Sequence, residues 1–282
     1  MIQPAFDIGN PETLPELDGN LLVEISGQSF NYILFTKDPY RLILLRQYRL
    51  YTTNDKMVRD ILEEIISGDT VLQQYAKRAI VIYNFPEANI LPEEYVNEQL
   101  NTPLNKLFFG ESDNGFLFNE KVRDWNLQNV YSVPKDIHSL FKEKFTGSSY
   151  WHFYSLLLGA SKKEVVEKVN YIRVVFYHDK FIAAFFIGGQ LQLIQTFNYQ
   201  TPEDVAYYLL LICKQFNQKQ QDVSLNISGL IDSQSALYTE LFKYFEDLQE
   251  DVVPLDMDTN DLLNELPAHY FSPLLKMSVC GL

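Results

Sequence analysis

The order of secondary-structure signals in Asn170–Gly229 constrains the fold more than any other feature of the chain. This stretch reads as three strands, a helix and a fourth strand. Gly188-Gly189 supplies the positive φ angles that a two-residue hairpin turn needs before the third strand. Thr201 predicts a helix N-cap, because a proline and two acidic residues follow it. The order therefore predicts a three-stranded meander that is extended by a right-handed crossover.

The same order of elements occurs once more, earlier in the chain. Predicted strands at residues 21–28, 29–36 and 42–51 precede a helix that is capped by Asn54-Asp55 and ends at Gly68, and a strand at 78–85 follows. The first strands begin at residues 21 and 170 and the helices at 54 and 202, so the two offsets are 149 and 148 residues. Because the strands and the helices of the two stretches are separated by nearly the same offset, the sequence predicts a duplicated unit.

The rest of each half can be aligned with the other. In the first half we expect an irregular insertion at 86–124 with a short helix near 92–100, a strand at 129–133, and helices at 134–145 and 150–158. In the second half we expect a helix at 233–248, a strand at 252–255 and a final helix at 267–280. The second half then reads βββαβαβα, which makes the chain an α/β protein. The expected division is a leader at 1–20 and domains at 21–160 and 161–282.

The charge and composition of the chain disfavour several classes of protein. The chain has 37 acidic and 23 basic residues and a net charge of −14, which disfavours binding to nucleic acids and to anionic membranes. No apolar run approaches the ~18–20 residues of a membrane span. Two cysteines, Cys213 and Cys280, do not make a disulfide framework. Because residues 1–18 also lack the pattern of a signal peptide, we expect a cytoplasmic protein.

The repeated order resembles the ribonuclease-H-like unit of the actin-like ATPase superfamily. That superfamily includes actin, the Hsp70 ATPase domain, sugar kinases and platform proteins of pili and secretion systems. Within it, the chain resembles a bacterial family of unknown function assigned to that fold, and the resemblance extends over Leu21–Leu282. It implies an actin-like fold with a cleft between the two halves, where the ATP-binding members hold their nucleotide.

The resemblance also implies where phosphates would bind in the first half. In ATP-binding members, a turn between the first two strands surrounds the phosphates. This turn carries an Asp-x-Gly-Thr-like motif, whose carboxylate contacts Mg²⁺ or water. The matching residues here are Glu24, Ser26, Gly27 and Ser29. The acid is Glu instead of Asp, and the glycine comes one position late, so this motif is degraded.

The second half departs further from the motif. Its matching turn contains His178, Asp179 and Lys180, has no glycine, and follows a strand without an acid. Ser228-Gly229 follows the fourth strand, where the superfamily places small residues against the adenosine. The alternative is that this pair only turns a strand into the next helix.

Two functions remain open at this point. Degraded motifs favour a non-catalytic interaction module whose partner is another protein or a second copy, with no cofactor. The alternative is an ATPase or kinase-like phosphotransferase that binds ATP and Mg²⁺ and uses Glu24 as the acid on the metal side. No metal site of the protein's own is expected, because the four histidines do not share metal-ligand spacing with each other or with a cysteine.

Overall fold

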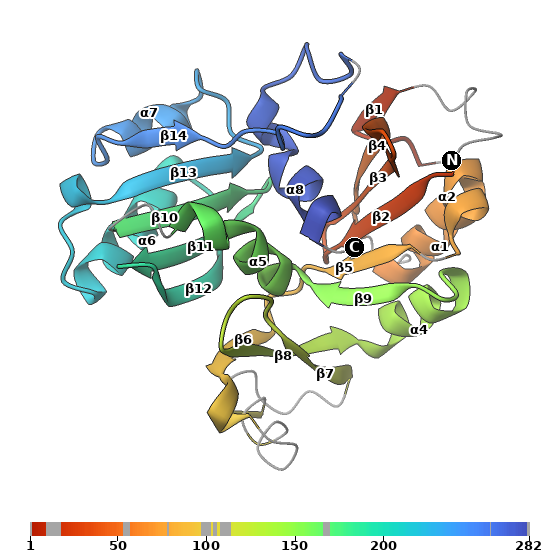
Figure 1. Cartoon of the computed structure of the whole chain (residues 1–282), viewed down its shortest axis with the longest axis horizontal. Coiled ribbons are helices and arrows are strands. Elements are labelled where there is room, and N and C mark those ends of the chain that lie inside the picture. The colour runs from red at the N-terminus through yellow and green to blue at the C-terminus, as the bar shows by residue number, and fades with distance from the viewer. Residues whose placement is uncertain are drawn as a thin grey trace. The chain divides into compact units, whose positions relative to one another are not determined.

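The chain divides into two compact units, each built around its own mixed sheet (Figure 1). The computed structural model describes residues 2–9, 18–52, 57–77, 79–96, 103, 106–107, 114–165, 170–259 and 261–280. Unit 1 comprises Met1–Gly159, Asp256–Leu263 and Ser278–Leu282, and unit 2 comprises Ala160–Leu255 and Asn264–Met277. The domain boundaries at residues 20 and 160 stay a prediction.

Unit 1 contains a six-stranded sheet in the order β1-β4-β3-β2-β5-β9. Its strands are β1 (Phe6–Gly9), β2 (Asn20–Ile25), β3 (Ser29–Lys37), β4 (Tyr40–Arg49), β5 (Ile80–Tyr83) and β9 (Ser149–His152). The strands β2, β3 and β4 are antiparallel, whereas β5 runs parallel to β2 and β9 parallel to β5. Three helices, α1 (Val58–Gly68), α2 (Thr70–Tyr75) and α4 (Lys135–Lys144), contribute apolar residues to the core on one face of this sheet.

Unit 2 repeats this arrangement. Its five-stranded sheet has the order β12-β11-β10-β13-β14, formed by β10 (Asn170–Phe176), β11 (Lys180–Ile187), β12 (Gln190–Asn198), β13 (Ser224–Gly229) and β14 (Leu248–Glu250). The first three strands are again antiparallel and the last two parallel. Helices α6 (Pro202–Gln215) and α7 (Ala236–Phe242) pack on one face. The predicted duplication of a ribonuclease-H-like unit is confirmed.

Two local predictions in unit 2 are confirmed in detail. The Thr201 hydroxyl accepts the Asp204 N–H at 3.3 Å, and the Asp204 carboxylate accepts the Thr201 N–H at 2.9 Å. This capping box satisfies two backbone donors that the first turn of α6 cannot satisfy itself. At the β11–β12 hairpin, Gly188 and Gly189 have φ angles of +54° and +77°.

The prediction of a helix over residues 150–158 is wrong in its first part. Ser149–His152 forms β9, which pairs with β5 in parallel, and helix α5 begins only at Phe153 and ends at Val165. The run shows neither the alternation of a strand nor the 3.6-residue period of a helix. The only local signal for a boundary between strand and helix is the change from the aromatic Tyr-Trp-His, typical of strands, to Ser-Leu-Leu-Leu.

The insertion in unit 1 is also more regular than predicted. It contains β6 (Ala88–Pro92), a short 3-10 helix (Glu93–Tyr95) and β7 (Gly115–Lys121). Together with β8 (Leu127–Pro134) these strands form a separate antiparallel sheet in the order β6-β8-β7. The strand predicted at 129–133 therefore belongs to this small sheet. Of the helix predicted near 92–100, residues 93–95 form the 3-10 helix, whereas residues 97–100 and the predicted cap Asn54-Asp55 lie outside the described residues.

The predictions for the end of unit 2 are displaced along the chain. Helix α7 ends at Phe242 and not at residue 248, and the next strand is β14 instead of residues 252–255. Val252 and Leu255 are 60% and 99% exposed, so their apolar character does not mark a buried strand. The final helix is a short 3-10 turn (Ala268–Tyr270) followed by α8 (Ser272–Cys280).

Candidate functional site

The hydroxyl of Ser26 closes the turn between β2 and β3. Its Oγ accepts the backbone N–H of Gln28 at 3.3 Å and that of Ser29 at 3.0 Å. The Ser26 N–H donates to the Ser29 carbonyl at 2.9 Å, and the two serine hydroxyls lie 2.9 Å apart. A phosphate in such a turn is bound by backbone amides. Three amides of this turn already have an acceptor within it.

Gly27 lies at the tip of this turn and makes no close approach to the rest of the chain. It is exposed, and a Cβ added there would meet no atom within 4 Å. Its φ angle is not positive either. The glycine is therefore not required by the geometry of the turn.

Glu24 is buried, with 3% of its surface exposed, at the end of β2 that leads into the turn. Its Oε2 accepts a hydrogen bond from the amide of Asn31 at 3.1 Å, and its Oε1 accepts one from the amide of Asn84 at 2.6 Å. Each carboxylate oxygen is thus held by a neutral amide. The structure brings Glu24, Ser26, Gly27 and Ser29 together in one corner of unit 1.

The corresponding turn of unit 2 separates its three polar side chains. The Tyr177 N–H donates to the Lys180 carbonyl at 2.8 Å, which makes His178-Asp179 a two-residue turn. Lys180 is buried, with its Nζ 5.0 Å from the centre of the Tyr177 ring, whereas His178 is exposed. The Asp179 carbonyl accepts the N–H of Tyr199 at 3.0 Å, which ties the turn to the end of β12.

Ser228 and Gly229 lie at the carboxyl end of β13, beside this turn. Ser228 is fully buried and its hydroxyl donates to the Val174 carbonyl at 3.2 Å. Gly229 pairs with Phe176 of β10 and has a φ angle of +80°. A Cβ at Gly229 would lie 2.1 Å from the Phe176 carbonyl oxygen. This contact between strands accounts for the glycine without a ligand.

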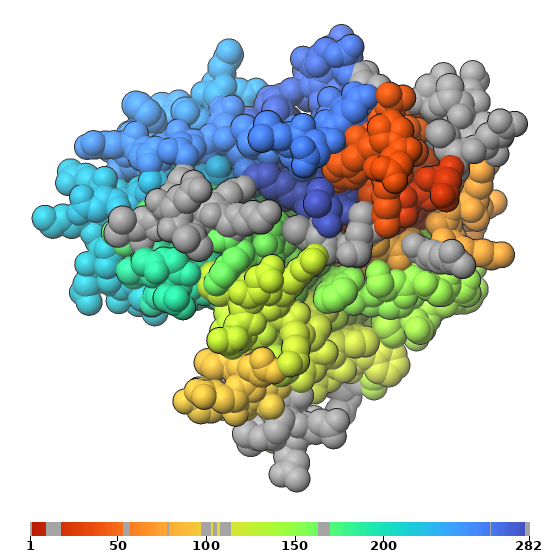
Figure 2. Space-filling view, in the orientation of Figure 1, coloured from red at the N-terminus to blue at the C-terminus, as the bar shows by residue number. Residues whose placement is uncertain are grey.

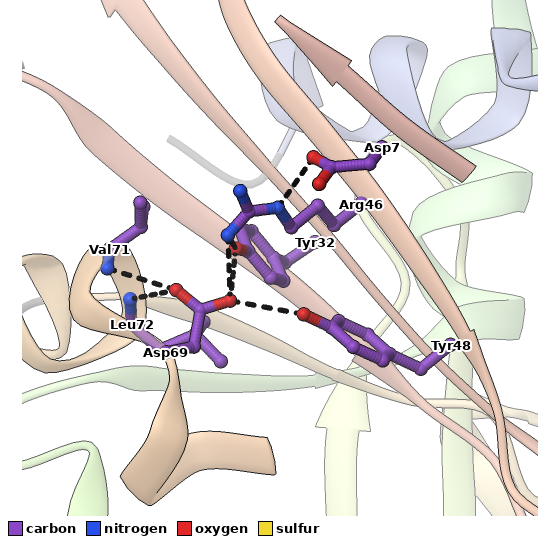
Figure 3. A network of polar contacts seen from close by, with 7 residues as sticks. All are labelled: Asp7, Tyr32, Arg46, Tyr48, Asp69, Val71 and Leu72. Carbon is purple, nitrogen blue, oxygen red and sulfur yellow. Dashed lines mark hydrogen bonds and ion pairs between the residues drawn. The ribbon is translucent and has the colours of Figure 1, made fainter. Parts of the chain in front are cut away.

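A second polar cluster, which the sequence did not predict, is centred on Asp69 in unit 1 (Figure 3). Oδ1 of Asp69 caps helix α2 by accepting the N–H groups of Val71 at 2.9 Å and Leu72 at 3.3 Å. Its Oδ2 accepts the hydroxyls of Tyr32 at 2.5 Å and Tyr48 at 3.2 Å. One carboxylate thus joins β3, β4 and the start of α2.

Arg46 connects this cluster to strand β1. Its guanidinium donates to Asp7 at 2.7 Å and to Asp69 at 3.1 Å (Figure 3). Burial lowers the pKa of Arg46, but the contacts with Asp7, Tyr32 and Asp69 outweigh it, so the pKa is raised and the group stays charged. Burial and the Asp69 carboxylate both raise the pKa of Tyr32, which keeps its hydroxyl protonated as a donor.

A cavity of about 210 Å³ lies beside Asp69 and Arg46. Its lining includes three carboxylates, from Asp7, Glu64 and Asp69, against the single guanidinium of Arg46. This balance is negative, and Arg46 is already bound by two acids, so the cavity is unsuited to a phosphate group. Asp69 after Gly68 is the pattern of a helix N-cap. That pattern was the one signal in the sequence for any part of this cluster.

Neither a metal-binding cluster nor a membrane-spanning helix is found among the described residues. They contain no group of three or more His, Cys, Asp or Glu side chains that could hold a metal ion. Among the helices that the structure describes, none is long and apolar enough to cross a membrane.

Comparison with solved structures finds the same fold in other proteins. A Bacteroides thetaiotaomicron protein with an actin-like ATPase fold and unknown function matches with a TM-score of 0.76 and 16% identity, over 93% of this chain and 99% of that one. The PilM–PilN type IV pilus biogenesis complex matches with a TM-score of 0.63 and 10% identity, over 95% and 99%. These likenesses establish the actin-like fold for the chain.

Comparison of the sequence with curated proteins finds no match. The family model for a protein of unknown function, DUF3822, matches residues 12–248, which is most of the chain. The chain therefore belongs to the DUF3822 family and has the actin-like ATPase fold.

Proposed function

We propose that the protein is a non-catalytic, cytoplasmic member of the actin-like fold that acts by contact with protein partners. The hydrogen bonding of Ser26 carries this proposal. Its hydroxyl accepts two amides of the β2–β3 turn, and its own amide donates to Ser29. A phosphate would have to break these bonds, each of which contributes about 0.5–1.5 kcal/mol.

The surroundings of Glu24 support the same proposal. A carboxylate that binds Mg²⁺ directs its oxygens at the ion or at the water molecules bound to it. Here both oxygens accept hydrogen bonds from the amides of Asn31 and Asn84. The negative charge of the chain and the unfavourable charge balance at the Asp69 cavity add to this. The PilM–PilN complex is a precedent for protein binding by this fold.

The test is a titration of the full chain with Mg-ATP and with Mg-ADP. Calorimetry measures the heat of binding, and thermal unfolding measures the shift in melting temperature. We expect no heat of binding and no shift in melting temperature. A ligand that binds only the native state at 100 times its Kd would stabilise it by about 2.7 kcal/mol, which is easily detected. The Glu24→Gln variant is the matched control. A shift seen with the native chain and lost in that variant would refute the proposal in favour of the ATPase alternative.

A further inference from the structure

We propose that the protein forms a twofold-symmetric dimer in which α6 packs antiparallel on α6 of a second copy. The inference deepens the proposed function, on which it rests, by naming a partner and a surface. Three buried residues of α6, Val205, Leu209 and Ile212, pack into the core on one face of the unit 2 sheet. The opposite side of the helix is directed away from this core and carries the proposed contact.

The outward side of α6 carries a stripe of side chains at the spacing of a coiled coil. Its members follow one another at intervals of four, three and four residues, namely Glu203, Tyr207, Leu210 and Lys214. Tyr207 is 62% exposed and Leu210 half-buried, so the middle of the stripe is apolar between two exposed charged ends. Leu211, which is 43% exposed, widens the apolar part. Because a surface helix usually directs polar residues outward, this stripe indicates a contact surface.

The stripe is complementary to itself when two copies run antiparallel. A twofold axis that passes midway along the stripe places Tyr207 opposite Leu210 of the second copy. The same axis places Glu203 opposite Lys214 of the second copy. Both ends of the contact then join opposite charges, and its middle joins apolar side chains. Parallel helices would instead face each charge with its like, which is repulsive. The order of charges along α6 therefore favours a second, antiparallel copy as the partner.

The end of α7 borders the acidic end of the stripe. A hydrogen bond to Glu240 raises the pKa of Lys243, and the charge of Glu203 adds to this shift, so Glu203 lies near Lys243. Two carboxylates around one ammonium group leave this end negative, which suits Lys214 of the second copy. Phe242, the last residue of α7, is 61% exposed and extends the apolar surface. In Figure 2 blue atoms of the α7–β14 segment lie at the surface, at the upper left.

The small size of the contact predicts a weak dimer. The stripe from Glu203 to Lys214 spans about 16 Å of helix. Two helices that pack over this length bury less than the roughly 1,200–2,000 Å² of a standard interface. Ion pairs at the exposed ends of the contact add little to its affinity. We therefore expect a dissociation constant in the range of about 10 µM to 1 mM.

The test is sedimentation equilibrium of the full chain at rising concentration. We expect the mass of the native chain to rise from 32.9 kDa toward twice that value. Glu203→Lys and Lys214→Glu each create like charges at both ends of the contact, so we expect each to raise the dissociation constant about tenfold or more. An equimolar mixture of these two variants restores opposite charges at both ends and is expected to dimerise like the native chain. The double variant Glu203→Lys/Lys214→Glu is expected to dimerise as well.

A third variant tests the apolar middle of the contact. Tyr207→Lys places a charge there and is expected to weaken association at least as much as the charge reversals. The matched control is Leu255→Lys, which places the same charge on a 99% exposed apolar residue of unit 2 outside α6. This control is expected to dimerise like the native chain. Circular dichroism verifies that every variant is folded.

Three results would overturn this inference. The first is a native chain that stays at 32.9 kDa up to about 1 mM. The second is a mixture of Glu203→Lys and Lys214→Glu that associates no better than either variant alone. The third is an equal effect of Tyr207→Lys and Leu255→Lys. Failure of the proposed function is distinguishable from all three, because it would appear as Mg-ATP binding, which the nucleotide titration measures independently of mass.

Discussion

Glu120 provides a prediction whose size follows from the structure. This half-buried residue of β7 accepts the His152 backbone N–H at 2.9 Å and the Tyr131 hydroxyl at 3.0 Å. Burial raises the pKa of Glu120 from 4.5 to about 7, although hydrogen bonds from Ser155, His152 and Tyr131 act in the opposite direction. The folded protein therefore holds this proton to a higher pH than the unfolded chain does.

The sign of the effect on stability follows from proton linkage. Between about pH 4.5 and pH 7 the folded state binds more protons at Glu120 than the unfolded state, so the free energy of unfolding falls as the pH rises through this window. Each pKa unit corresponds to about 1.4 kcal/mol, which gives at most about 3 kcal/mol for this shift. Partial solvation of a half-buried group reduces that value. Above the window the contribution is constant.

Replacement of Glu120 by Gln removes the charge and keeps the shape of the side chain. We expect Glu120→Gln to be more stable than the native chain at about pH 8, and to lose the decline in stability between about pH 5 and pH 8. Both tryptophans, Trp125 and Trp151, lie in unit 1, so urea unfolding followed by tryptophan fluorescence reports on the unit that contains Glu120. The exposed Glu94 of the same insertion gives the control Glu94→Gln. Equal pH slopes in the native chain and in Glu120→Gln would refute this reasoning.

Two further substitutions, each with a control, test the contact of Gly229 with β10 and the contacts of the Asp69 cluster. Gly229→Ala places a Cβ 2.1 Å from the Phe176 carbonyl oxygen at a positive φ angle, so we expect a loss on the order of 3 kcal/mol by urea unfolding. Gly27→Ala, where a Cβ meets nothing, is the control and should lose less than about 1 kcal/mol; equal losses would contradict the argument. Asp69→Asn leaves Arg46 without its buried counter-charge and should lose on the order of 3 kcal/mol. Asp7→Asn, at the 46% exposed partner of the same guanidinium, should lose less than about 1 kcal/mol; the reverse order would show that Asp69 does not anchor the cluster.

The sequence predicted the elements whose signals are local. The capping box at Thr201 and the glycine pair of the β11–β12 hairpin occur at the expected positions, because each depends on a few neighbouring residues. Strand β9 was missed because its four residues, of which only His152 is buried, show no clear alternation and lead directly into the apolar start of α5. Strand β14 was misplaced because its position depends on pairing with β13, which no local pattern encodes.

The chemistry of the candidate sites was less predictable than the fold. The sequence placed Glu24 and Ser26 in one turn, but the direction of the Ser26 hydroxyl depends on the geometry of that turn. The Asp69 cluster was out of reach for a different reason. Asp7, Arg46 and Asp69 come from distant parts of the sequence and meet only in the folded unit.

The corner of unit 1 is closed by hydrogen bonds that the chain itself supplies. Ser26 is fully buried, and its hydroxyl satisfies two amides that a nucleotide-binding turn leaves for a phosphate. Without that hydroxyl, the ligand-free turn would have to present unpaired donors to water, and it would gain stability only when a phosphate arrived. Here the amides of Ser26, Gln28 and Ser29 each have an acceptor within the turn. Under the proposed function, a turn of this kind gains nothing from a nucleotide, and the fold is retained for its surfaces.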